Sequence, residues 1–276
     1  MASQKPFFSI IIPTLNEEKY LPHLLSDLAS QSFRDFEVII VDGHSNDQTV
    51  KLAKAWAPKI PKLTILTSPK RQVCVQRNLG AHHAKSQIFL FSDADNRLPS
   101  YFLQGIKYRW ESSCADILAC WLEPDPPSAA NNILGNAMNF FLEIQNNVKP
   151  TYLMESMVII SKKCFDEIGG FDESINYAEG KSVIQAASAL GYTSKVIHDP
   201  LYSFSFRRFK KYGMLKVASH VASLELSSLL GMDAVNLKAE KLYPMAGGAL
   251  FNQNKKVKTK FQKNIAKLLA SLKNSN

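Results

Sequence analysis

The chain has 276 residues, of which 46% are hydrophobic and 21% are charged. These proportions are typical of a globular protein and exclude the fibrous and intrinsically disordered classes. The length fits one large domain with a C-terminal appendage. The net charge of +9 is concentrated after Glu240, where eight lysines and no acidic residue follow. A basic surface that runs through the folded body, as expected of a nucleic-acid-binding protein, is therefore not indicated.

The cysteines and the apolar segments bear on the cellular compartment. The four cysteines show no CxxC spacing, so we expect reduced thiols and neither a disulfide framework nor a cysteine metal site. The apolar stretch 7–12 is too short for the core of a signal peptide, and no run long enough to span a bilayer occurs. We expect a cytoplasmic protein without a transmembrane helix.

Strand-like and helix-like segments alternate along the first 120 residues, which favours a mostly parallel sheet. Asn16 is expected to cap the first helix, and a capping box at 45–48 is expected to open the second. The third helix is predicted at 72–84. Short apolar runs predict buried strands at 7–12, 36–41, 63–67 and 88–91.

The middle of the chain continues this pattern, and the end of the chain differs from it. Pro99 starts a helix, and a Gly169-Gly170 turn follows later in the chain. Further strands are expected at 115–121 and 152–160, and further helices at 129–146 and 178–190. The residues from about 207 onward are helical and amphipathic in pattern. We therefore predict an α/β domain over residues 1–205 and a helical C-terminal region over residues 206–276.

Polar clusters follow three of the predicted strands, at 13–17, 42–45 and 93–95. In an open α/β sheet, ligands bind beyond the carboxyl ends of the strands. Asp93 and Asp95 could face one cleft and supply the oxygen ligands that a hard divalent cation prefers. A lone pair of this spacing can also merely cap a turn, but three clusters in order favour a binding site.

Five motifs in order resemble the family 2 glycosyltransferases of the GT-A fold, and the resemblance covers residues 7–200. The motifs are SIIIPTLNEE at 9–18, VDGHSNDQT at 41–49, RNLGA at 77–81, FSDAD at 91–95 and GGFDE at 169–173. The resemblance implies a Rossmann-like, mostly parallel central sheet flanked by helices. It also implies transfer of a sugar from a nucleotide-diphosphate sugar to a hydroxyl acceptor, with inversion at the anomeric carbon.

The resemblance also assigns roles to individual positions. It implies that Asp95 binds Mn²⁺ or Mg²⁺ directly and that Asp93 lies near the metal or the ribose. The nucleotide-sugar would be contacted by Pro13, Thr14, Glu17, Asp42, Arg77 and Arg207. Arg77 would approach the diphosphate, whose geometry suits a guanidinium group, and Arg207 would help to close the site over it. The alternatives are a helix-surface arginine at position 77 and a basic helix start at position 207.

One position departs from the family pattern. An inverting transferase needs a general base that deprotonates the acceptor hydroxyl, and the family places an Asp for this task in a Glu-Asp pair. Here the pair is Glu179-Gly180. Glu179 is the candidate base, and Asp172 and Glu173 are further candidates.

Two other functions remain open. The loss of the Asp at position 180 also fits a nucleotide-sugar-binding protein of the same fold without catalytic activity. A nucleotidyltransferase is less well supported, because the loop after the first strand is Pro-Thr-Leu-Asn-Glu and not glycine-rich and basic.

The tail at 254–273 carries an apolar stripe with lysines on the remaining faces. Such a basic amphipathic helix can lie at an anionic membrane surface, and it can equally dock on the protein body with its lysines in water. Because similar transferases act on lipid-linked acceptors, the resemblance implies a glycan or lipid-linked acceptor and peripheral contact with the inner face of the cell membrane.

Overall fold

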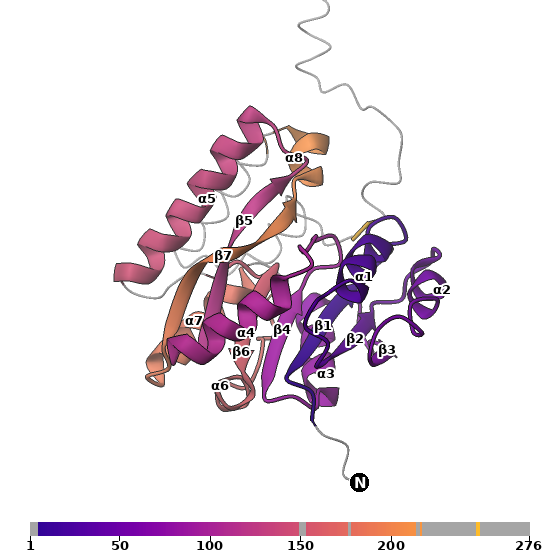
Figure 1. Cartoon of the computed structure of the whole chain (residues 1–276), viewed down its shortest axis with the longest axis horizontal. Helices are drawn as coiled ribbons and strands as arrows, with labels where there is room; N and C mark the ends of the chain where they lie inside the picture. The colour runs from indigo at the N-terminus through magenta and orange to yellow at the C-terminus, as the bar shows by residue number, and fades with distance from the viewer. Residues whose placement is uncertain (1–4, 149–152, 176–177, 214–215, 217–246, 249–276) are drawn as a thin grey trace, which may run out of the picture.

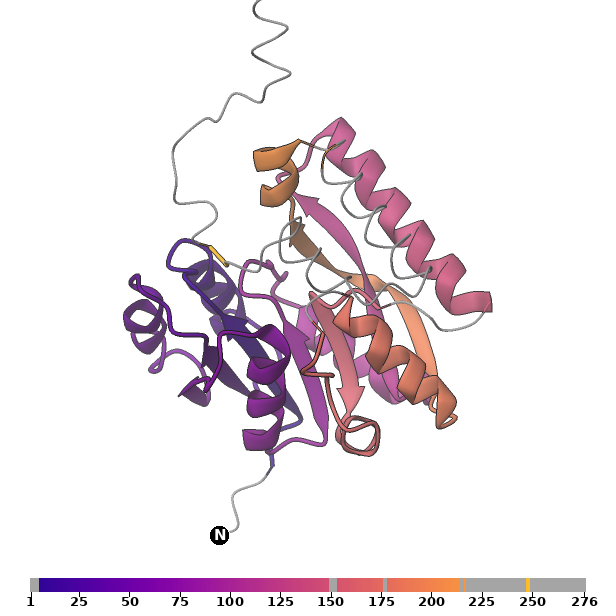
Figure 2. The ribbon, with the colours of Figure 1, turned by 180° about the vertical axis from the view of Figure 1, so that it is seen from behind.

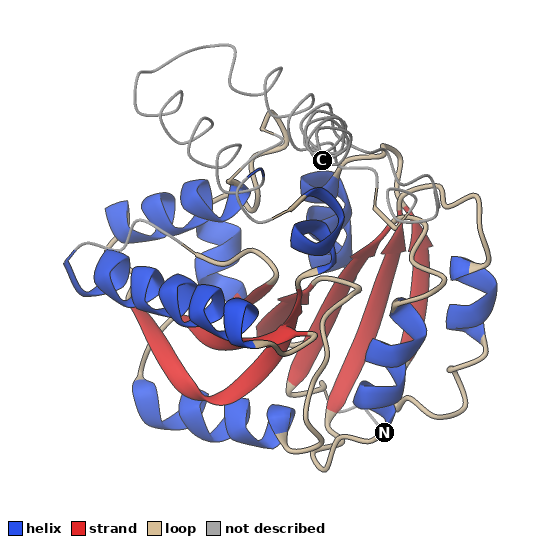
Figure 3. Ribbon diagram, turned by 90° about the horizontal axis from the view of Figure 1, so that it is seen from above, coloured by secondary structure: helices blue, strands red, loops and turns tan. Residues whose placement is uncertain are grey.

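The computed structural model describes residues 5–148, 153–175, 178–213, 216 and 247–248 (Figure 1). These residues form a mixed seven-stranded sheet with the strand order β3-β2-β1-β4-β6-β5-β7. Helices cover both faces of this sheet (Figure 3). The α/β class and the mostly parallel sheet that the sequence predicts are confirmed.

The first half of the sheet is parallel and contains β1 (Phe8–Thr14), β2 (Phe36–Asp42), β3 (Leu63–Thr67) and β4 (Ile88–Ser92). Both faces of β1, β2 and β4 are buried, as is usual for parallel strands that carry helices on each side. In the register of β1 and β2, Thr14 pairs with Asp42. The ends of these two strands therefore lie side by side.

The second half of the sheet contains β5 (Ile117–Asp125), β6 (Met157–Ser161) and β7 (Ser194–Ser205). β6 is antiparallel to both β4 and β5, whereas β5 and β7 are parallel to each other. In the β4–β6 register, Ser92 pairs with Met157. The residues just before β6 therefore meet the carboxyl end of β4.

The helices divide between the two faces of the sheet (Figure 2). α1 (Leu21–Ala29) and α4 (Phe102–Ser113) contribute to one apolar core, and α2 (Thr49–Lys54) packs against α1. α3 (Val73–His83), α6 (Lys162–Glu167) and α7 (Glu179–Ala189) contribute to the other core. The long helix α5 (Ala129–Val148) packs beside β5 and β7, and α8 (Arg207–Tyr212) follows β7.

The expected strands and long helices are present, and most of their bounds differ by only a few residues from those predicted. The strand β7 and the short helix α6 are not among the predicted elements. Two predicted helix caps are wrong. α1 begins after Tyr20 without a side-chain cap, and the Asn16 side chain instead accepts a hydrogen bond from the backbone N–H of Asn46.

The capping box at 45–48 is the second wrong cap. Ser45 hydrogen-bonds the Asp42 carboxylate and the backbone N–H of Asn16, so it connects two loops at the strand ends. α2 begins at Thr49, whose backbone N–H donates to Asp47 Oδ1. Asp47, two residues before α2, therefore satisfies the first backbone N–H of this helix. Asn16 and Ser45 therefore connect the loops after β1 and β2 and do not cap the helices that follow.

Three sequence predictions concern membranes, thiols and the C-terminal region. None of the helices in the described part of the chain combines the length and apolar character needed to cross a bilayer. The four cysteines are free, as expected. Of the predicted helical region 206–276, the structure describes α8, Gly213, Lys216 and residues 247–248, and the tail at 254–273 lies outside the described residues.

Candidate active site

The carboxyl ends of the parallel strands carry most of the residues predicted for the site. Pro13 and Thr14 end β1, and Asp42 ends β2. Asp93 and Asp95 follow β4 directly. Thr14 and Asp42 are buried, and the Asp42 carboxylate accepts hydrogen bonds from Ser45. Three strand ends thus meet at one edge of the sheet.

Arg77 of α3 is the centre of a buried ion-pair cluster. Its side chain is only 2% exposed, so its alternative interpretation as a helix-surface residue is wrong. Nη1 donates to Glu179 Oε1 over 2.7 Å, and Nη2 donates to Asp93 Oδ1 over 3.0 Å. Nη2 also donates to the carbonyl oxygen of Glu155 over 3.1 Å, and the guanidinium carbon lies 5.1 Å from the centroid of the Phe171 ring. Arg77 therefore joins α3, α7 and the end of β4.

Arg207, the first residue of α8, is the centre of a second cluster. It donates to both carboxylate oxygens of Glu17, over 2.6 and 2.8 Å, and its Nε lies 2.8 Å from Asp95 Oδ2. Its guanidinium carbon lies 4.4 Å from the centroid of the Tyr20 ring. The fold thus brings together three residues that are far apart in the sequence, at positions 17, 95 and 207.

The site holds more acidic than basic groups. The carboxyl groups of Glu17, Asp93, Asp95 and Glu179 face two guanidinium groups, which leaves a formal excess of two negative charges when all are ionised. Burial raises the pKa of Glu17 to about 7 against the lowering effect of Arg207, and Asp95 and Asp93 raise it further. Burial also raises the pKa of Asp93 to about 6, against the lowering effect of Arg77 and with a further rise from Asp95. A divalent cation would relieve this repulsion, and the carboxylate oxygens are suitable ligands for it.

The candidate bases differ in their surroundings. Glu179 is 5% exposed and is held by its ion pair with Arg77. Asp172 and Glu173 are exposed in the turn before α7, where Asp172 accepts from Ser174 and Glu173 accepts from Asn78. Neither of these two contacts belongs to the Arg77 or Arg207 cluster.

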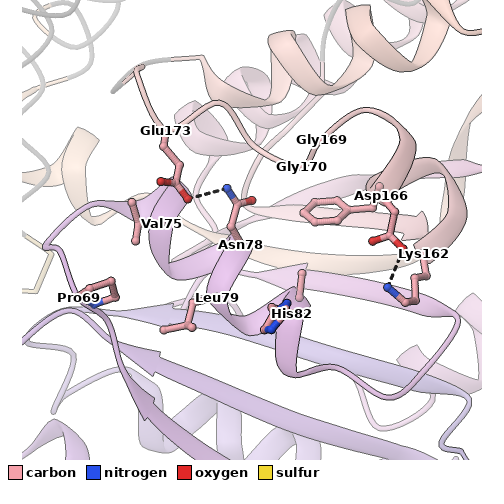
Figure 4. Close-up of a pocket in the computed structure, with 12 residues that line it drawn as sticks. Pro69, Val75, Asn78, Leu79, His82, Lys162, Asp166, Gly169, Gly170 and Glu173 are labelled. Carbon is pink, nitrogen blue, oxygen red and sulfur yellow. Dashed lines mark hydrogen bonds and ion pairs between the residues drawn. The ribbon is translucent and has the colours of Figure 1, made fainter.

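A groove of about 600 Å³ lies elsewhere, between α3 and the Gly169-Gly170 turn (Figure 4). Its lining includes Asn78, His82 and Glu173. Of the residues predicted for the site, it contains only Glu173, a further candidate base, and none predicted for the nucleotide or the metal. The carboxylate and arginine clusters at the strand ends, and not this groove, offer the chemistry that a charged ligand and a metal require.

The structure adds three residues to the site. Glu155 precedes β6 and contacts Arg77, Tyr20 lies against Arg207, and the backbone N–H of Gly248 donates to the carbonyl oxygen of Leu15 over 3.0 Å. Figure 1 shows residues 247–248, in yellow, near α1. Glu155 lies within the segment 152–160, which the sequence predicts as a strand, and no motif marks it. Only the three-dimensional arrangement identifies these residues.

Comparisons with known proteins agree with this arrangement. Residues 9–169, more than half of the chain, match the sequence profile of glycosyl transferase family 2. The poly(ribitol-phosphate) beta-N-acetylglucosaminyltransferase TarS of Staphylococcus aureus is 23% identical over 86% of this chain and 42% of its own length. A PGL/p-HBAD biosynthesis glycosyltransferase of Mycobacterium bovis is 40% identical over 34% of this chain and 37% of its own length. The chain thus spans less than half the length of these curated relatives.

Solved structures show the same fold. The mannosyltransferase PcManGT of Pyrobaculum calidifontis, in complex with GDP-Man and Mn²⁺, superimposes with a TM-score of 0.66 at 17% identity, over 88% of this chain and 70% of that one. The S. aureus TarS fragment 1-349, in complex with UDP, gives a TM-score of 0.57 at 24% identity, over 72% and 60% of the two chains. The sheet therefore has the GT-A fold predicted from the motifs. Together with the match over residues 9–169, this shows that the chain belongs to glycosyl transferase family 2.

Proposed function

We propose that the chain transfers a sugar, with inversion, from a nucleotide-diphosphate sugar to a hydroxyl group of an acceptor. The observation that carries this proposal is the meeting of Glu17, Asp93 and Asp95 with Arg77 and Arg207 at one edge of the sheet. Guanidinium groups suit diphosphate oxygens, and carboxylates suit a divalent metal. Such an arrangement fits a donor whose leaving group carries several negative charges.

The roles proposed for the residues follow from their places. Pro13, Thr14, Glu17 and Asp42 line the nucleoside end of the site, and the arginines Arg77 and Arg207 serve the diphosphate. The ion pairs of Arg77 with Glu179 and Asp93 fix its guanidinium before any substrate arrives. A guanidinium group fixed in this way loses little side-chain entropy when it binds phosphate.

Mn²⁺ or Mg²⁺ would be held by Asp95, with Asp93 beside it. When bound, the metal would neutralise charge on the leaving diphosphate. Asp95 Oδ2 is paired with Arg207 Nε, and Arg207 also donates to both carboxylate oxygens of Glu17. Arg207 would help to close the site over the diphosphate, the role that the resemblance to the family implies.

Asp95→Asn tests the metal site. We expect this variant to lose turnover and metal-dependent donor binding while its thermal unfolding remains close to that of the wild type. Asp166→Asn, which alters an exposed carboxylate paired with Lys162 on α6, is the matched control and should bind the donor normally. Calorimetry that finds metal-dependent donor binding unchanged in Asp95→Asn would rule out this ligand assignment.

The donor is tested with a panel of nucleotide sugars that includes UDP-GlcNAc and GDP-mannose, each with Mn²⁺ or Mg²⁺. Hydrolysis or transfer from one donor would support the enzyme and assign its donor class. Gly180, where the family has an Asp, favours a second candidate, a nucleotide-sugar-binding protein without catalytic activity. Binding without turnover of any donor in the panel, with acceptors present, would favour that candidate.

The acceptor and the membrane contact are proposed from relatives and sequence alone. We take the acceptor to be a glycan or a lipid-linked molecule, because the relatives include enzymes named for poly(ribitol-phosphate) and for PGL/p-HBAD biosynthesis. The lysine-rich tail would place the protein at an anionic membrane surface.

A further inference from the structure

The space next to Gly180 is already filled by another carboxyl group. A Cβ atom at position 180 would lie 2.8 Å from Cγ of Glu155 and 3.0 Å from the carbonyl oxygen of Leu153. Contacts below 3.0 Å essentially do not occur for real Cβ atoms. An Asp at position 180 and the present Glu155 side chain therefore exclude each other, and the glycine gives Glu155 its place.

Glu155 is fixed beside the Arg77 cluster from both ends. Its Oε1 accepts a hydrogen bond from the backbone N–H of Gly180 over 3.1 Å, and its carbonyl oxygen accepts one from Arg77 Nη2 over 3.1 Å. The next residue, Ser156, accepts a hydrogen bond from the backbone N–H of Asp93 over 3.0 Å. The Glu155 carboxyl group is thus held at the start of α7, while the backbone that carries it is bonded to Arg77 and, through Ser156, to Asp93.

Glu179 is less suited to proton transfer than Glu155. Its Oε1 lies 2.7 Å from Arg77 Nη1, and the side chain is 5% exposed. A carboxylate that stabilises a buried guanidinium group is a weak base, because its protonation would leave that cation short of a partner. The Glu155 carboxyl group, by contrast, accepts its hydrogen bond at Oε1 from a neutral backbone N–H and not from a guanidinium group.

We propose that Glu155 is the general base of this transferase and replaces the Asp that Gly180 lacks. The inference rests on the glycosyl transfer proposed above. The acceptor hydroxyl oxygen forms a bond to the anomeric carbon as the bond from that carbon to the diphosphate oxygen breaks. The electron pair of the broken bond leaves with the diphosphate, and the hydroxyl proton passes to the Glu155 carboxylate. Glu179 is then a positioning residue that holds Arg77.

The charged groups around Glu155 set the direction of its pH dependence. Burial raises the pKa of Glu155 to about 8, the charge of Glu179 raises it further, and Arg77 and the Gly180 N–H lower it. Tyr202 of β7, which hydrogen-bonds Ser156, lies near Glu155 among the described residues. Only the ionised carboxylate accepts a proton, so turnover through Glu155 increases as the pH rises through this pKa.

The test compares Glu155→Gln, Glu155→Asp and Glu179→Gln with the wild type, on the donor found in the nucleotide-sugar panel. Glu155→Gln should lower kcat by roughly 10²–10⁴-fold, with a donor Kd within about threefold of the wild type. Its residual rate should no longer show the rise with pH. Glu155→Asp should recover part of the rate, and Glu111→Gln, an exposed carboxylate of α4 paired with Lys107, is the matched control. Glu179→Gln should weaken donor binding and keep the rise with pH.

Two results would overturn the inference while leaving the proposed function intact. One is wild-type kcat in Glu155→Gln, and the other is a pH rise that persists in Glu155→Gln but disappears in Glu179→Gln. A wild-type protein that binds donors but turns none over would instead remove the transferase proposal, and with it the need for a base. If donor binding and thermal unfolding are unchanged in Glu155→Gln, a decrease in kcat reflects the loss of the base and not a loss of the fold.

Discussion

The ion pair between Arg77 and Glu179 should contribute to stability as well as to the site, and Glu179→Gln tests this contribution. Gln has nearly the same shape as Glu and can still accept a hydrogen bond from Arg77. The substitution therefore removes the charge and little else. Arg77 keeps its contacts with Asp93 and with the carbonyl oxygen of Glu155.

The size of the effect follows from these remaining contacts. Breaking a buried ion pair by removing one partner costs about 3–5 kcal/mol when the other charge is left alone. Here Asp93 remains 3.0 Å from the guanidinium group and the hydrogen bond to residue 179 is kept, so the free energy of unfolding should decrease by about 1–1.5 kcal/mol, the difference between a charge-assisted and an ordinary hydrogen bond. The exposed control Glu111→Gln should change the free energy of unfolding by less than about 0.5 kcal/mol.

The assay is equilibrium unfolding in urea at one fixed pH, without added metal, followed by tryptophan fluorescence. The midpoint for Glu179→Gln should decrease while the slope m stays unchanged, since the same surface is exposed on unfolding. A loss no larger than that of Glu111→Gln would refute the reasoning. It would mean that Asp93 alone compensates the buried charge of Arg77.

Three further predictions concern packing, pH and the tail. Gly80→Ala should destabilise the protein by about 1–3 kcal/mol, because the added Cβ would lie 2.4 Å from Cγ2 of Ile11. Helix propensity alone suggests the opposite, a higher urea midpoint, and that result would contradict the prediction. Without metal, the raised pKa values of Glu17 and Asp93 mean that the native state binds more protons than the unfolded state. The stabilisation that these two groups contribute should therefore be fully present below about pH 4 and be lost as the pH rises to about 7. The decrease should be less steep in Glu17→Gln, and an equal slope in both proteins would exclude Glu17 as a cause. The full chain should sediment with anionic liposomes at low salt and be released at high salt. A chain ending at Asn252 should stay in the supernatant. Equal sedimentation of both chains would show that the tail is not the anchor.

Much of the fold could be predicted from sequence because hydrophobic periodicity reports burial directly. β1, β2 and β4 are short apolar runs buried on both faces. A short, continuous apolar run is the sequence pattern typical of such a buried strand. β7 could not be found in this way, because exposed charged residues such as Lys195 and Asp199 interrupt its pattern. The wrong caps at Asn16 and Ser45 share one cause, since side chains suited to capping also suit hydrogen bonds between neighbouring loops.

The candidate site could be predicted in part for a similar reason. Thr14, Asp42 and Asp93 belong to local motifs at strand ends, and the topology of a parallel sheet is enough to bring such ends together. The contact of Arg207 with Glu17 and Asp95 spans most of the chain, and its geometry depends on the path of β7. No local pattern contains that information.

Glu155 shows why a missing motif residue is weak evidence for a lost activity. A reacting group needs a carboxylate at a certain point in space, and the chain can deliver it from any backbone that passes nearby. β6 is antiparallel to β4, so the residues just before it pass the carboxyl end of that strand and bring residue 155 next to α7. Once Glu155 occupies this space, a side chain at position 180 has no room, because its Cβ would also meet the carbonyl oxygen of Leu153. Gly180, which in the sequence suggests the loss of a catalytic Asp, leaves the space in the fold that the Glu155 carboxyl group occupies.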